Sequence, residues 1–100
     1  MKILIPVNGD DFENTSICPQ NEVKKWLLIE VLEGEIKNHN FFATIEEISD
    51  WYDCVIVQNQ NEYVWNFMEQ GIGVLVVTTQ QNVEEIVEAF LFKELHEINS

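Results

Sequence analysis

The chain has 100 residues, a mass of 11.7 kDa and a formal net charge of −13, because 18 aspartates and glutamates stand against only 5 lysines and arginines. This length fits one domain, residues 1–100, and leaves no room for a second core. The hydrophobic share of 46% is typical of globular proteins, so the acidic residues coat a folded domain. The charge argues against nucleic acid and anionic membrane surfaces as partners, since both are themselves negative.

The first apolar segment, residues 2–7, predicts a strand covered on both faces. It is too short for a transmembrane helix, and no small-residue cleavage site follows it. Cys18 and Cys54 do not make a disulfide framework. We therefore expect reduced thiols and a cytoplasmic location.

An irregular loop is predicted over residues 8–21, which contain a glycine, a proline and several short polar residues. A loop this long in so small a domain often carries function. After it, residues 26–31 and 36–42 predict a hairpin around the turn Glu33-Gly34. The second arm is rich in polar residues, so we expect it near a sheet edge.

The second half of the chain alternates helix and strand. Capping-box patterns occur at Thr44–Glu47 and Asn82–Glu85. In each, the first side chain and the glutamate three positions later accept hydrogen bonds from free backbone N–H groups at the start of a helix. In chain order we expect a short helix from 44, a strand at 54–57, a helix at 61–70 closed by Gly71, a strand at 74–77 and a helix over 83–91. The resulting order β-β-β-α-β-α-β-α predicts an α/β fold, a mixed five-stranded sheet with helices on both faces.

Several stretches together resemble the dinitrogenase iron-molybdenum cofactor family. They are residues 1–8, 28–31 with 33–35, and 53–57, 71–74 and 83–91, ending in Lys93-Glu94-Leu95. The match keeps the family's order over nearly the whole chain. It implies a ribonuclease-H-like α/β motif and a non-catalytic protein that carries an iron-sulfur or iron-molybdenum cluster. The implied partners are the cluster-assembly proteins of nitrogenase cofactor biosynthesis, in nitrogen fixation.

The sequence departs from that family at the positions that usually carry the family's ligand-binding motifs. Residues 19–22 read Pro-Gln-Asn-Glu where the family usually has His-Phe-Gly. Residues 58–61 and 78–82 replace two glycine-containing turns, in which backbone amides approach an anion closely. The expected histidine and glycines are therefore absent.

Cys18, in the long loop, is the candidate metal ligand, because a thiolate is the natural ligand of iron in clusters. The alternative is a loop cysteine that only packs. Cys54 lies in a predicted core strand and is expected to be buried. His39 and His96 have no second ligand at a recognisable spacing, so both are expected at the solvated surface.

Side-chain amides gather after the predicted parallel strands, at residues 58–61 and 80–82. In open α/β sheets, ligands bind at the carboxyl ends of the strands. Together with the loop before residue 22, these amides would line an uncharged crevice that donates hydrogen bonds. The candidate cofactor-binding residues are Cys18, Gln20, Asn21, Asn59 and Asn61. The alternative is that these amides are ordinary solvated loop residues.

No catalytic constellation is recognisable, so the chain is not expected to be an enzyme. The carboxylates Asp10 and Asp11 follow the first strand whereas Asp53 precedes the fourth, so we expect them at opposite ends of parallel strands. This placement and the net charge of −13 argue against a two-metal nuclease. Two hypotheses remain. One is the cluster carrier that the resemblance implies, and the other is a diverged protein-protein interaction module of the same fold without cluster binding.

Overall fold

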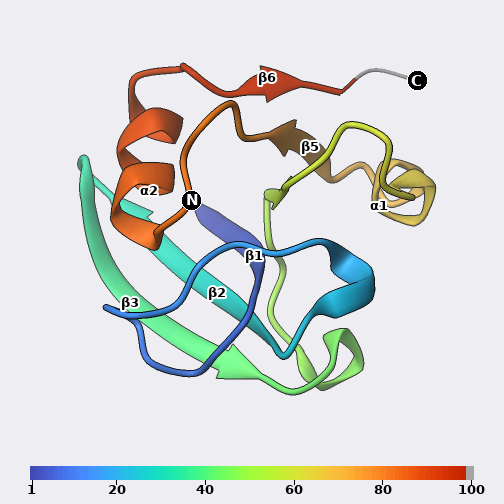
Figure 1. Cartoon of the computed structure of the whole chain (residues 1–100), viewed down its shortest axis with the longest axis horizontal. Coiled ribbons are helices and arrows are strands. Elements are labelled where there is room, and N and C mark those ends of the chain that lie inside the picture. Colours follow the sequence, from blue (N-terminus) through green and yellow to red (C-terminus); the bar gives the residue numbers. More distant parts are fainter. Residues whose placement is uncertain (99–100) are drawn as a thin grey trace.

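The computed structural model describes residues 1–98, and at its centre is a six-stranded sheet in the order β3-β2-β1-β4-β5-β6 (Figure 1). The strands β1, β4 and β5 run parallel, whereas β2, β3 and β6 pair antiparallel with their neighbours. The strands are β1 Lys2–Val7, β2 Lys25–Leu32, β3 Glu35–Phe42, β4 Cys54–Val57, β5 Gly73–Val76 and β6 His96–Glu97. The helices are α1 Trp65–Glu69 and α2 Val83–Leu91, with short 3-10 turns η1 Gln20–Glu22 and η2 Ile45–Glu47. The predicted α/β class and mixed sheet are confirmed.

The central strand β1 is buried on both faces, as its uninterrupted apolar sequence predicts. Ile3 and Ile5 point into a core that includes Ile86 and Val87 of α2. Leu4 points to the opposite face, whose core includes Phe67 of α1. One helix therefore covers each face of the sheet, as expected.

The hairpin β2–β3 turns through Glu33 and Gly34, both with positive φ (54° and 77°), the conformation of a two-residue type I′ turn. Farther along, Glu30 pairs with Asn38 but Val31 pairs with Ile36. Lys37 is thus an extra residue, and it forms a β-bulge in β3. The outer side of β3 is an edge of the sheet, as predicted.

Two predicted helices are shorter than expected. The capping box of Thr44 and Glu47 is present, but it starts only the 3-10 turn η2, since the chain extends again from Ile48. One turn supplies too few hydrogen bonds to sustain a helix by itself. The helix predicted from residue 61 begins only at Trp65, because Asn59 to Glu62 form a turn. Its end at Gly71, with φ 77°, agrees with the prediction.

The sheet has six strands where five were predicted. The additional strand β6 has two residues, and His96 and Glu97 pair with Val76 and Leu75 of β5. Two residues are too few to show a hydrophobic alternation, so the sequence does not reveal this strand. It forms by hydrogen bonding to the outer side of β5. Within residues 1–98, no helix is both long and apolar enough to cross a membrane.

Candidate functional site: an amide-lined pocket

A pocket of about 610 Å³ opens where the loops after β1 and β4 meet. These strands are parallel neighbours, so the segments that follow their carboxyl ends emerge at the same edge of the sheet. In Figure 1 the loop between β1 and β2 crosses in front of the sheet toward α1. The pocket is lined by Pro19, Gln20, Asn21, Glu22, Asn59, Asn61, Glu62, Tyr63 and Asn66.

The pocket brings together four of the five residues proposed from the sequence to bind a ligand. Gln20 and Asn21 come from the first loop, and Asn59 and Asn61 from the second. The other amide segment, residues 80–82, lies outside this pocket. The carbonyl of Gln81 accepts a hydrogen bond from the N–H of Ile17, and the side chain of Asn82 accepts one from the N–H of Glu85 at the start of α2. The expectation that all the amides share one crevice was therefore wrong.

The pocket is not uncharged, because two carboxylates line it. Glu62 joins its two loops: Oε1 accepts a hydrogen bond from the backbone N–H of Gln20 at 3.0 Å, and Oε2 accepts one from the N–H of Asn59 at 2.8 Å. Gln20 also donates through Nε2 to the carbonyl of Tyr63, at 3.0 Å. Glu22 makes no side-chain hydrogen bond among residues 1–98. We refer to the arrangement of Glu62 with the Gln20 and Asn59 amides as the Glu62 clamp.

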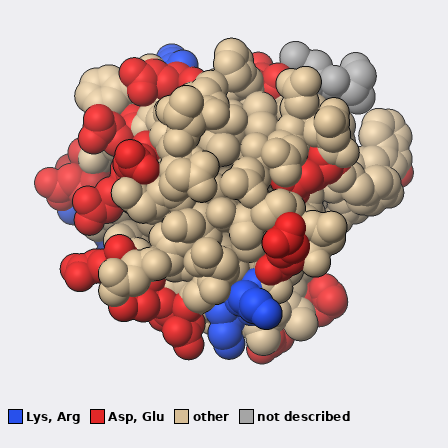
Figure 2. All heavy atoms as spheres, viewed as in Figure 1, with Lys and Arg blue, Asp and Glu red and all other residues tan. Residues whose placement is uncertain are grey.

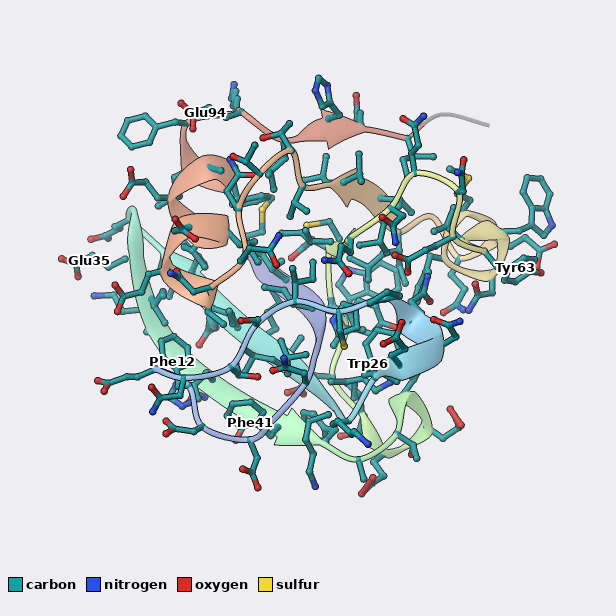
Figure 3. The ribbon with its side chains drawn as sticks, in the orientation of Figure 1. Phe12, Trp26, Glu35, Phe41, Tyr63 and Glu94 are labelled. Atoms are coloured by element: carbon teal, nitrogen blue, oxygen red, sulfur yellow. The ribbon has the colours of Figure 1, made fainter. Side chains whose placement is uncertain are left out.

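Three asparagine side chains in the pocket, Asn21, Asn61 and Asn66, have no hydrogen-bond partner within the described part of the chain. Each offers two N–H donors and a carbonyl acceptor. Beside them Tyr63 is 70% exposed, and Figure 3 shows it at the edge of the molecule near α1. The pocket can therefore both donate and accept hydrogen bonds, which suits polar or polypeptide ligands.

The candidate ligand Cys18 is beside this pocket but does not line it. Its side chain is buried, with 7% of the residue exposed, and its N–H donates to the carbonyl of Pro6 at 3.1 Å. Burial raises the pKa of the Cys18 thiol; a hydrogen bond with the backbone of Lys24 lowers it, and the charges of Glu22 and Glu62 raise it further. The net effect disfavours the thiolate, which is the form of cysteine that binds metals.

The other potential metal ligands do not supplement Cys18. No group of three or more His, Cys, Asp or Glu side chains in residues 1–98 is arranged to hold a metal ion. His39 packs against Phe12, with ring centroids 4.3 Å apart, and His96 lies on β6. The donors of this pocket therefore do not fit direct coordination of an iron-sulfur or iron-molybdenum cluster, and they leave hydrogen bonding as the means of binding.

Two further predictions about single residues agree with the structure. Cys54 is buried in the core, and burial, with a smaller effect of the Asp53 charge, raises its pKa to about 12. Asp53 accepts a hydrogen bond from the N–H of Lys2 at 2.7 Å, at the start of β1, whereas Asp10 and Asp11 follow its end. The carboxylates therefore lie at opposite ends of the strand.

Acidic side chains are unevenly distributed over the surface. Figure 2 shows many of them along the side where α2 and β3 lie in Figure 1, whereas the centre of the same face is largely free of charged side chains.

Comparison with known proteins finds similarity in structure only. Neither a protein-family profile nor a curated protein sequence matches the chain. A crystal structure from Methanocaldococcus jannaschii, provisionally described as a dinitrogenase, superimposes with a TM-score of 0.76 at 18% identity, over 100% of this chain and 96% of that one. An NMR structure of that protein gives the same TM-score and identity and covers 94% of its chain. The protein PH0822 superimposes with a TM-score of 0.75 at 14% identity, over 97% and 96% of the two chains. At these identities the likeness establishes a shared dinitrogenase-like α/β fold.

Proposed function

We propose that this chain is a non-catalytic, cytoplasmic binding protein of the dinitrogenase-like fold, and that its amide-lined pocket contacts a segment of a protein partner. The observation that carries the proposal is the convergence of unpaired amides from two loops on one cavity of about 610 Å³. Backbone groups of a polypeptide both donate and accept hydrogen bonds, as asparagine side chains do. The exposed ring of Tyr63 adds apolar area of the kind found at protein interfaces.

The hydrogen bonds that connect the two pocket loops support this proposal. The Glu62 clamp and the bond from Gln20 to Tyr63 hold the two pocket loops together without a ligand. A site that is already ordered loses less conformational entropy when it binds.

A photo-crosslinking amino acid in place of Asn61 tests this function in extract of the cells to which the chain is native. The matched control places the same group at Asn38, an exposed asparagine on β3. We expect one protein to be captured from position 61 and not from position 38. The purified partner should bind about tenfold more weakly to a variant with Asn21→Ala and Asn66→Ala, because interface residues of this kind cost about 1.4 kcal/mol together. Equal capture from both positions, or unchanged affinity, would contradict the proposal.

Carriage of an iron-sulfur or iron-molybdenum cluster is the second candidate function. It is favoured by the dinitrogenase-like fold and by the position of Cys18 beside the pocket. Against it stand the burial of the Cys18 thiol and the nearby charges of Glu22 and Glu62, which disfavour the thiolate, and the lack of companion ligands within residues 1–98.

Anaerobic reconstitution with iron, sulfide and molybdate separates the two candidates. A cluster carrier would retain near-stoichiometric iron, show visible thiolate-to-iron absorption, and lose both in Cys18→Ala. We expect a colourless, metal-free protein, and also no binding of a preformed cofactor in a separate titration. Retention of iron that depends on Cys18 would establish the carrier function instead.

A further inference from the structure

A second surface, beside α2, is apolar, and its part next to β3 is also acidic. A hollow of about 620 Å³ lies between α2 and the start of β3, and a second one of about 560 Å³ lies next to it, with Leu91 lining both. We call the two hollows together the α2 groove. Its apolar lining residues are Met1, Phe12, Ile36, Leu75, Val87, Phe90, Leu91, Phe92 and Leu95.

Phe92 is the most prominent member of this lining, with 70% of the residue exposed. It follows the last turn of α2, where Lys93 adopts a left-handed conformation (φ 59°) and the N–H of Glu94 donates to the carbonyl of Ala89 at 2.8 Å. This helix-ending motif fixes the backbone on both sides of Phe92. An aromatic ring held in water by an ordered backbone is typical of an interface anchor.

The border of the first hollow is acidic. Glu84 and Glu88 lie one turn apart on α2, and neither forms an ion pair within residues 1–98. Like charges at this spacing destabilise a helix. Glu35, on the opposite border, pairs with Lys37 at 3.0 Å. Figure 3 shows Phe12, Glu35 and Glu94 on one side of the molecule, the side on which Figure 2 shows acidic side chains to be dense.

We propose that the α2 groove docks a basic amphipathic helix of a partner protein. Two adjacent apolar hollows suit successive apolar side chains on one helix face, as in other helix-in-groove complexes. Lysine or arginine on that helix would neutralise Glu84 and Glu88 and relieve their mutual repulsion. A second copy of this chain would bring another net charge of −13 to the same surface, so self-association is disfavoured.

The test uses a designed helical peptide of leucine and lysine in an amphipathic pattern, with its binding followed by fluorescence anisotropy. Because an acidic protein attracts any cationic peptide, the essential control is a peptide of identical composition in scrambled, non-amphipathic order. We expect the patterned peptide to bind about tenfold more tightly than the scrambled one, and this preference to disappear in Phe92→Ala. Equal affinity for both peptides would overturn the proposal.

Matched variants separate this surface from the rest of the molecule. Tyr63→Ala removes an equally exposed aromatic ring beside the other pocket, on the opposite side of the view in Figure 3, and should leave the preference unchanged. Glu84→Gln with Glu88→Gln should weaken the patterned peptide and reduce the salt dependence of its binding. Circular dichroism establishes that each variant is folded. A Tyr63→Ala effect as large as that of Phe92→Ala, or a dimer in sedimentation that Phe92→Ala dissociates, would refute the docking of a basic helix here.

Discussion

The Glu62 clamp makes a quantitative prediction about stability. Glu62→Ala removes the acceptor of two backbone N–H groups, those of Gln20 and Asn59, which belong to loops far apart in sequence. A hydrogen bond to a charged acceptor contributes about 1.5–3 kcal/mol when the groups are buried. Here one bond is partly buried and the other exposed, so water replaces part of each. We expect the free energy of unfolding to fall by about 1–2 kcal/mol in total.

The assay is thermal and urea unfolding beside a matched variant, Glu22→Ala. Glu22 lines the same pocket and carries the same charge, but its side chain accepts no hydrogen bond within residues 1–98. Both variants reduce the net negative charge equally, so the difference between their stabilities reports the two backbone hydrogen bonds of Glu62 together with a longer one from Asn59 Nδ2, at 3.4 Å. The midpoint Tm of Glu62→Ala should lie about 5–15 °C below that of Glu22→Ala.

Formate provides an independent readout, since it can occupy the carboxylate position that Glu62→Ala vacates. We expect formate to raise the Tm of Glu62→Ala more than that of the wild type, at an ionic strength matched with chloride. If Glu62→Ala and Glu22→Ala unfold together and formate distinguishes neither, the clamp does not stabilise the pocket.

Three further predictions concern the core, a turn and a helix cap. Burial raises the pKa of Cys54 from its ordinary 9.0 to about 12, so its stabilising contribution is complete below pH 9 and is lost as pH rises toward 12. Between pH 9 and 11, Cys54→Ala should therefore lose less stability than the wild type in urea unfolding, by up to about 1.4 kcal/mol per pH unit. Gly71→Ala places a side chain on a left-handed backbone and should lower the free energy of unfolding by about 1–2 kcal/mol, measured in urea. Gly73→Ala, whose new methyl group would make only ordinary contacts, should lower it clearly less. Equal losses in the two variants would contradict this conformational explanation. Asn82→Ala removes the acceptor of the Glu85 N–H at the start of α2 and should lower the free energy of unfolding by about 1 kcal/mol, a loss that Asn82→Ser should largely restore.

The strands were predictable because their apolar runs are continuous and their turns carry distinct residues. The bounds of β1 and β4 follow from apolar runs bordered by polar residues, and the hairpin turn follows from Gly34. The helix α2 combines a capping box with regularly spaced apolar residues, so two local signals agree. At η2 a capping box stands without a sustained apolar face, and the helix does not continue.

The pocket was only partly predictable, for a physical reason. The position of Asn59 and Asn61 follows from a general property of parallel strands, whose carboxyl ends meet at one edge. The role of Glu62 depends on Gln20, which is 42 positions away, and no local pattern encodes that contact. Glu62 was instead assigned to a helix, because its neighbours have helical spacing. The acidic lining of the pocket was missed for the same reason.

The bulge at Lys37 has a consequence for how the protein behaves at high concentration. The hairpin arm β3 is eight residues long, and among residues 1–98 it has a neighbouring strand on one side only. A flat strand of this length would be a template for fibril growth between molecules. The additional residue bends β3 and places a lysine on it, so a neighbouring copy cannot continue the hydrogen-bond ladder in register. At high protein concentration, a chain without Lys37 would therefore present a straighter edge, on which a second copy could pair more readily.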